Sequence, residues 1–225
     1  MDRPVVALIL AGGTGTRLYP ASRSDRPKQF QSFGSDRSLL AETVDRAGFA
    51  DETYVLTRES FAGEIHGHAP EAAVLTEPAP KDTGPALIYG AHRIREQVGD
   101  CVLLVLPSDH VVGEGFRPVA ERAARVAVET GGLVTIGIEP DRPATGYGYI
   151  SPGRQRSGYF SVDAFVEKPD ADTARQKTDG TENTGNSEDK RRCKQTDSGV
   201  EPGEDDPQSN TLQSPRGNTE CSRHP

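Results

Sequence analysis

A glycine-rich segment near the N-terminus is the strongest chemical pattern in the sequence. Residues 5–10 (VVALIL) are continuously apolar and lead directly into Ala-Gly-Gly-Thr-Gly-Thr-Arg at positions 11–17. Glycines let backbone N–H groups approach a phosphate or a base with no side chain between them. Arg17 adds a cation inside the loop, which suits binding of a triphosphate. The pattern therefore predicts a phosphate-binding loop, with a tight structural turn as the alternative.

Two familiar glycine motifs do not fit this segment. No Gly-Lys-Ser/Thr closes it, so it is not a P-loop. After Gly13 and Gly15, the third glycine position of a dinucleotide fingerprint holds Leu18, which argues against a dehydrogenase. A second candidate cation follows at Lys28, the only lysine in the first 80 residues.

Apolar runs of strand length alternate along the chain with stretches of helical periodicity. This alternation predicts an α/β fold with a mostly parallel sheet and helices on both faces. Ligands of such sheets bind at the carboxyl ends of the strands, where the loops after Leu10 and Leu106 fall. The predicted strands are 5–10, 53–57, 73–76, 101–106, 133–138 and 160–167, and the predicted helices are 38–47, 83–98 and 116–130.

Composition divides the 225 residues into a folded domain, 1–175, and a polar tail, 176–225. The tail holds only four apolar residues (Cys193, Val200, Leu212 and Cys221). Such a segment buries too little apolar surface to offset its ordering entropy, so we expect it to be disordered.

Net charge and hydropathy exclude several classes of protein. A net charge of −8 argues against nonspecific nucleic-acid binding. No apolar stretch reaches the roughly 18 residues of a membrane span, so we expect no membrane insertion. The N-terminus lacks a signal-peptide pattern, which indicates a cytoplasmic protein. The 3 cysteines form no zinc-type spacing.

Five ordered motifs resemble those of the mannose-1-phosphate guanylyltransferases, a family of sugar-1-phosphate nucleotidyltransferases. The first joins the glycine loop and its Ser22-Arg23 to Pro-Lys-Gln-Phe, an extension typical of the guanylyl branch. The family usually has Arg-Asn-Thr where this chain has Lys81-Asp82-Thr83. The motifs occupy residues 11–30, 77–86 (EPAPKDTGPA), 106–110 (LPSDH), 146–150 (GYGYI) and 165–169 (FVEKP).

The resemblance implies a Rossmann-like nucleotidyltransferase fold and a reaction. The enzyme would transfer a guanylyl group from GTP to mannose 1-phosphate, giving GDP-mannose and pyrophosphate. Arg17 and Lys28 would be catalytic, and Asp109 would bind Mg²⁺, although a helix N-cap is its alternative role. The implied sugar-binding residues are Gly148, Glu167 and Lys168. The implied nucleotide-binding residues are Leu10, Ala11, Gly12, Gly13, Thr14, Gly15, Thr16, Arg17, Lys28, Pro107, Ser108 and Asp109.

The family pattern breaks off after residue 175. A further helix, an Asn-Ser-Gly strand and a second metal-binding aspartate are expected there, and none is recognisable. We therefore expect a truncation or a frameshift, with a natural tail as the alternative. Two other readings stay open: a catalytically incomplete fragment that binds nucleotide, and a nucleotidyltransferase for another sugar or base. The sequence leaves the oligomeric state open, a homo-oligomer included.

Overall fold

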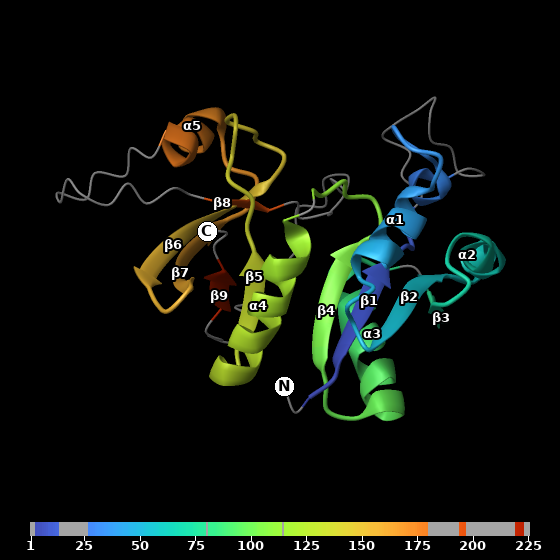
Figure 1. The fold of residues 1–225 in the computed structure, drawn as a ribbon. Coiled ribbons are helices and arrows are strands. Elements are labelled where there is room, and N and C mark those ends of the chain that lie inside the picture. Colours follow the sequence, from blue (N-terminus) through green and yellow to red (C-terminus); the bar gives the residue numbers. More distant parts are fainter. Residues whose placement is uncertain are drawn as a thin grey trace. The chain divides into compact units, whose positions relative to one another are not determined.

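The computed structural model describes residues 3–13, 27–79, 81–113, 115–179, 194–196 and 219–222. The chain forms two units, Met1–Pro118 and Val119–Pro225 (Figure 1). The boundary between them lies inside helix α4 and within the stretch 1–175 that the sequence predicts as one domain.

The first unit is built on a four-stranded sheet in which every neighbouring pair is parallel. The strand order is β3-β2-β1-β4, with β1 at Val5–Leu10, β2 at Glu52–Arg58, β3 at Ala73–Glu77 and β4 at Val102–Pro107. The register places Leu10 opposite both Leu56 and Pro107. The carboxyl ends of β1, β2 and β4 therefore line one edge of the sheet, as the sequence predicts.

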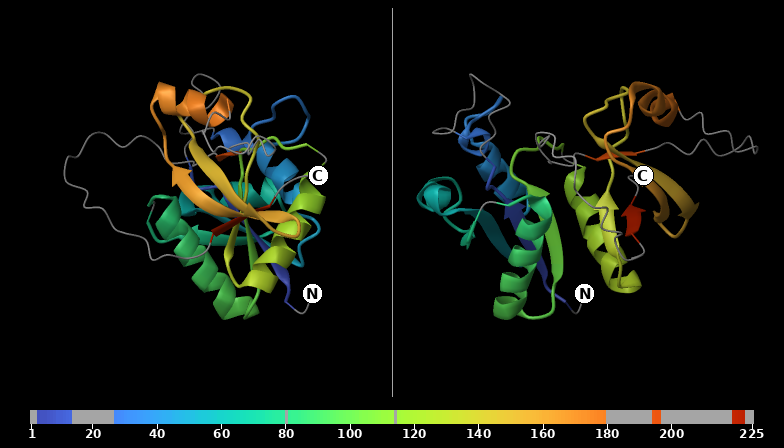
Figure 2. Two further views of the ribbon diagram at one scale, coloured as in Figure 1. Left: turned by 90° about the vertical axis from the view of Figure 1, so that its left-hand side faces the viewer. Right: turned by 180° about the vertical axis from the view of Figure 1, so that it is seen from behind.

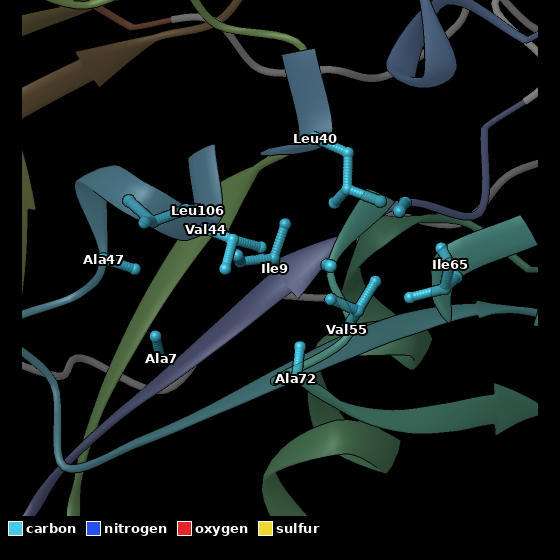
Figure 3. Packing of buried hydrophobic residues seen from close by; sticks show 11 residues of the cluster. Ala7, Ile9, Leu40, Val44, Ala47, Val55, Ile65, Ala72 and Leu106 are labelled. Carbon is cyan, nitrogen blue, oxygen red and sulfur yellow. The ribbon is translucent and has the colours of Figure 1, made fainter. Parts of the chain in front are cut away.

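Helices cover both faces of this sheet because side chains along β1 alternate in direction. Ala7 and Ile9 pack against α1 (Leu39–Arg46) and α2 (Ala62–His68) in one buried cluster (Figure 3). Val6 and Leu8 pack on the opposite face, under α3 (Thr83–Val98). Helix α1 lies in front of the sheet in Figure 1, and α3 lies in front of it in the view from behind, on the right of Figure 2.

Local sequence signals set the ends of these helices. The hydroxyl of Ser38 caps α1 by accepting a hydrogen bond from the Ala41 N–H, 3.2 Å away. Helix α3 ends at Gly99, whose φ of 90° is open to glycine alone. Two short 3₁₀ helices, η2 (Lys28–Phe30) and η3 (Glu59–Phe61), complete the first unit.

The second unit contains a mixed five-stranded sheet in the order β5-β9-β7-β6-β8. Its strands β6 and β7 form an antiparallel hairpin, because the turn that joins them is too short for a parallel crossover. Only the β5–β9 pair is parallel. The elements are α4 (Phe116–Thr130), β5 (Leu133–Ile136), β6 (Gly148–Gln155), β7 (Tyr159–Val166), α5 (Ala171–Asp179), β8 (Lys194–Thr196) and β9 (Thr219–Ser222).

Three elements fall in the stretch 176–225 for which the sequence predicts disorder. Helix α5 continues past residue 175 to Asp179, and the short strands β8 and β9 join the sheet. The strands β8 and β9 pair with β6, β7 and β5, and the rest of the predicted tail after Asp179 lies outside the described residues. Within the described ranges, no helix has the length and apolar content needed to cross a bilayer.

Candidate functional site

The start of the glycine loop is held at the carboxyl edge of the parallel sheet. The Ala11 N–H donates to the Leu56 carbonyl at 2.8 Å, which continues the β1–β2 ladder by one residue. The Ala11 carbonyl accepts two side-chain hydrogen bonds, from Thr57 Oγ1 at 3.0 Å and from Gln29 Nε2 at 3.1 Å. The first residues of the loop therefore have a defined backbone position before any ligand binds.

The 3₁₀ helix η2 brings Lys28 to the same edge. Its Phe30 ring packs edge-on against Phe61 and stacks on His68, with ring centroids 6.0 and 5.1 Å apart. These contacts hold η2 against η3 and α2 of the same unit. Lys28 Nζ forms an ion pair with Asp109 Oδ2, and the two side chains are 33% and 20% exposed. An ammonium group with this exposure is accessible to a phosphate.

Asp109 reaches the site because β4 ends beside β1. The N–H of Ser108, which is 4% exposed, donates to the Leu10 carbonyl at 3.1 Å. This bond ties the Pro107-Ser108-Asp109 turn to the end of β1, one residue before the glycine loop. The structure thus brings Asp109, Lys28 and the described part of the loop to one place. Thr14, Gly15, Thr16 and Arg17 lie outside the described residues.

A carboxyl group that the sequence did not single out also adjoins the loop. Glu77, at the end of β3, places Oε1 only 2.4 Å from where a Cβ on Gly12 would stand. Burial raises the pKa of this carboxyl, and the Lys81 N–H that donates to it and the charge of Arg58 partly offset that rise. The side chain of Arg58 also lies against Gly12, and its buried Nε has no hydrogen-bond partner among the residues that the structure describes. Glycine at position 12 is what lets the Glu77 carboxyl come so close.

The second unit gathers the other three predicted residues at the end of its hairpin. A Cβ on Gly148 would stand 2.4 Å from Phe165 Cζ and 2.9 Å from Glu167 Oε2. Glu167 Oε1 lies 3.9 Å from Lys168 Nζ. The Lys168 N–H donates to the Tyr147 carbonyl at 3.2 Å, which closes the end of β6 on the end of β7. Gly148, Glu167 and Lys168 therefore form one cluster.

Lys168 has a strained backbone. Its φ of 41° lies in the left-handed region, and it is the one non-glycine residue with positive φ in the part of the chain that the structure describes. Backbone strain of this kind costs of order 1–3 kcal/mol and is concentrated at functional sites. The strain sets the direction in which the Lys168 side chain leaves the strand end.

Comparison with known proteins shows the family of the chain. The family described as Nucleotidyl transferase matches residues 6–188, which include both clusters. The chain belongs to this family. The matched span contains both sheets except Val5 and strands β8 and β9.

Several relatives of this chain carry informative names. Xanthan biosynthesis protein XanB of Xanthomonas campestris is 42% identical over 179 residues, or 76% of this chain and 38% of its own. A mannose-1-phosphate guanylyltransferase of Sinorhizobium fredii is 37% identical over 182 residues, or 76% of this chain and 35% of its own. This chain thus spans little more than a third of the length of these relatives.

A solved structure shares the fold. The crystal structure of mannose-1-phosphate geranyltransferase from Thermus thermophilus superposes with a TM-score of 0.73 at 35% identity. The match covers 78% of this chain and 53% of the Thermus chain. The Rossmann-like α/β fold that the sequence predicts is therefore confirmed.

The metal chemistry implied for the site can be tested against the donors in this chain. Within the described ranges, no group of three or more His, Cys, Asp or Glu side chains is arranged to hold a metal ion. Mg²⁺, however, is usually held by one or two carboxylates together with substrate phosphates and water. Asp109 offers one oxygen ligand of that kind beside the glycine loop. The donor set fits a magnesium ion that the nucleotide helps to bind.

Sequence reasoning missed two neighbours of the loop, Gln29 and Glu77, as site residues. Both stand in motifs quoted for the resemblance, Pro-Lys-Gln-Phe and Glu-Pro-Ala-Pro. The usable signal for Glu77 was its place directly after the strand predicted over 73–76, and that for Gln29 was its place next to Lys28. Their contacts with the loop depend on tertiary folding, which no local pattern encodes.

Proposed function

We propose that this chain transfers a guanylyl group from GTP to mannose 1-phosphate, giving GDP-mannose and pyrophosphate. The guanylyltransferase named among its relatives supports the reaction class. The observation that favours guanine over the other bases is the position of the Glu77 carboxyl beside Gly12. Guanine presents two adjacent donors, N1–H and N2–H₂, on one edge, and a carboxylate with two acceptor oxygens complements them.

The other bases match this carboxyl less well. Adenine and cytosine offer an acceptor beside their amino group, and uracil offers a single N–H between two carbonyls. A carboxylate that faces those acceptors is repelled by them. Burial already disfavours the charged form of Glu77, so two hydrogen-bond donors from guanine would stabilise that form most. We therefore expect GTP to be preferred over ATP, CTP and UTP.

The reaction requires no general base. A phosphate oxygen of mannose 1-phosphate, already an anion, forms a bond to the α-phosphorus of GTP. The bond from that phosphorus to the oxygen bridging the β-phosphorus breaks, and pyrophosphate leaves with the electron pair. What the protein must provide is positioning and positive charge, since two anions meet.

Named residues would supply this charge. Lys28 would lie against the α-phosphate, because its ammonium group is partly exposed at the loop, and Arg17 would contact the leaving phosphates. Asp109 would hold Mg²⁺, which when bound adds positive charge beside the phosphates. Glu167 would accept hydrogen bonds from sugar hydroxyls, and Lys168 would bind the sugar phosphate.

Pyrophosphate release tests this proposal. The chain is incubated with Mg²⁺, each of the four nucleoside triphosphates, and mannose 1-phosphate or glucose 1-phosphate. We expect release that needs both GTP and mannose 1-phosphate. Release with a different triphosphate or sugar phosphate, and not with this pair, would overturn the proposal.

A matched pair of variants tests the role of Glu77. Glu77→Gln replaces one of two acceptor oxygens by a donor, so kcat/KM with GTP should fall about tenfold or more, as expected for a lost hydrogen bond to a charged group. Glu71→Gln, an exposed change shortly before β3, should leave kcat/KM unchanged. Equal values for both variants would remove Glu77 from base recognition.

A second candidate is nucleotide binding without turnover. The observation in its favour is that the described residues bring a single carboxylate, Asp109, to the expected metal position. Calorimetric titration with GTP, run beside the pyrophosphate assay, separates the two functions. Binding without product supports the second candidate, and product formation rules it out.

A further inference from the structure

The side-chain amide nitrogen of Gln29 binds the backbone of the glycine loop. Gln29 is only 2% exposed, and it follows Lys28 directly in η2. Its Nε2 donates to the Ala11 carbonyl at 3.1 Å and to the Gly13 carbonyl at 3.1 Å. An amide nitrogen has two hydrogens, so both are used by these two bonds.

These bonds set the direction of a loop N–H. In a trans peptide the carbonyl of one residue and the N–H of the next point in opposite directions. Gln29 and Thr57 together hold the Ala11 carbonyl, so the Gly12 N–H points away from both of them. Among the described residues, no carbonyl or side chain accepts a hydrogen bond from this N–H. It is the kind of donor that a bound nucleotide uses.

Gln29 also joins the loop to the catalytic lysine. One turn of three residues carries Lys28 toward Asp109, Gln29 toward the loop and Phe30 into its aromatic contacts. A shift of η2 would therefore move the ammonium group and the loop carbonyls together. This linkage fixes the distance between the cation and the loop N–H groups before the nucleotide arrives.

We propose that Gln29 is a positioning residue for the nucleotide: its buried amide holds the Ala11 and Gly13 carbonyls so that the loop is preorganised beside Lys28. The inference rests on the proposed function, because it assigns the loop to GTP. Gln29 itself contacts no substrate. Its loss should weaken GTP binding and leave the affinity for mannose 1-phosphate unchanged.

The chemistry of position 29 gives a graded series of variants. Gln29→Met keeps the length and removes both donors. Gln29→Glu turns a carboxylate toward two carbonyl oxygens, so it should be the most damaging. Gln29→Asn keeps the amide but is one methylene shorter, so it should retain part of the function.

Thr43→Val is the matched control for stability. The Thr43 side chain is fully buried and donates to the Leu39 carbonyl at 2.8 Å within α1, so its loss also removes a buried hydrogen bond to a backbone carbonyl. Its hydrogen bond lies within α1 and involves no residue of the glycine loop. If the role of Gln29 were purely structural, the Gln29 variants and Thr43→Val would both lose stability and both keep the wild-type affinity for GTP.

The experiment measures the thermal midpoint, the Kd for GTP, and kcat and KM for both substrates. For Gln29→Met we expect Kd and KM for GTP to rise about tenfold, the equivalent of one or two lost hydrogen bonds, with KM for mannose 1-phosphate unchanged. Thr43→Val should lower the midpoint and leave both GTP constants within a factor of about two. Gln29→Asn should fall between wild type and Gln29→Met, and it carries the test if the Met variant fails to fold.

The outcomes separate this inference from the proposed function. Gln29 variants that lose stability like Thr43→Val but keep the wild-type Kd for GTP would overturn the positioning role while the reaction stands. GTP binding without turnover by the wild type would overturn the proposed function, and the Kd series would still decide the role of Gln29. No GTP binding by the wild type would overturn both.

Discussion

Replacing Lys168 by glycine should separate backbone strain from side-chain function at the end of the hairpin. Lys168 holds a φ of 41°, and its N–H donates to the Tyr147 carbonyl at 3.2 Å. A residue with a Cβ pays about 1–2 kcal/mol for this left-handed conformation, and glycine does not. Lys168→Gly therefore removes a cost from the folded state.

Two smaller terms oppose that gain. Glycine raises the entropy of the unfolded chain, which costs roughly 0.5–1 kcal/mol. The variant also loses the ion pair with Glu167, whose 3.9 Å separation and side-chain exposures of 34% and 42% place it among weak surface pairs worth below about 1 kcal/mol. The net expectation is a stability between about 1 kcal/mol lower and about 1.5 kcal/mol higher than wild type.

Denaturant unfolding of three variants checks this arithmetic. Lys168→Ala keeps the strain and loses the ammonium group, so it should be less stable than Lys168→Gly. Gly131→Ala is the reciprocal control, since Gly131 has a φ of 65° with open space around it, and an added Cβ there should cost about 1 kcal/mol. Both Lys168 variants should lose activity toward mannose 1-phosphate equally, since both lack the cation.

One result would refute the reasoning. If Lys168→Gly proved less stable than Lys168→Ala by about 1 kcal/mol or more, the backbone at position 168 would not be strained. If the two variants differed in kcat/KM by more than the assay error, the conformation rather than the charge would carry the function.

Three further predictions follow from the two units. Gly148→Ala would press a Cβ against Phe165 Cζ, 2.4 Å away, and should lower kcat/KM for the sugar phosphate about tenfold while the Kd for GTP is unchanged. Gly90→Ala would place a Cβ 2.7 Å from Leu8 Cδ2 and should cost about 1–3 kcal/mol of unfolding free energy, seen in the denaturant midpoint. The Thr173 N–H donates to the Asp170 carboxylate, which holds the pKa of that carboxyl below its ordinary 3.8. The folded state therefore binds the proton less tightly than the unfolded state. The resulting contribution to folding stability is present above pH 3.8 and is lost as the pH falls through the lower pKa of the folded state. Asp170→Asn should flatten the pH dependence of unfolding below about pH 4, and an unchanged slope would count against the Asp170–Thr173 contact.

Much of the first unit could be predicted from residue patterns. The apolar runs predicted as buried strands at 5–10 and 101–106 form β1, which is mostly buried, and β4, which is mostly only partly buried. The helix predicted over 83–98 matches α3. Both loops that follow these strands reach one sheet edge, because parallel strands share the edge at which they end. Asp109 lies at this edge for that reason, whereas Lys28 is brought to it by η2.

Other features depend on tertiary contacts or broken patterns. Strand β6 was not predicted, because Gly148, Pro152 and Gly153 interrupt its alternation of apolar residues. Helix α2 was missed because it has seven residues and two glycines. The approach of Glu77 to Gly12 follows from the pairing of β3 with β2 and of β2 with β1, which spacing alone does not give.

The central place of β1 has a consequence for the newly made chain on the ribosome. The strand Val5–Leu10 is synthesised first, pairs on one side with β2, and must wait for β4, which ends at Pro107, to cover its other side. Until then one edge of an apolar strand stays open, and such edges recruit foreign strands. Pairing between segments so distant in sequence is also slow. Aggregation during synthesis should therefore depend on how quickly residues 102–107 emerge.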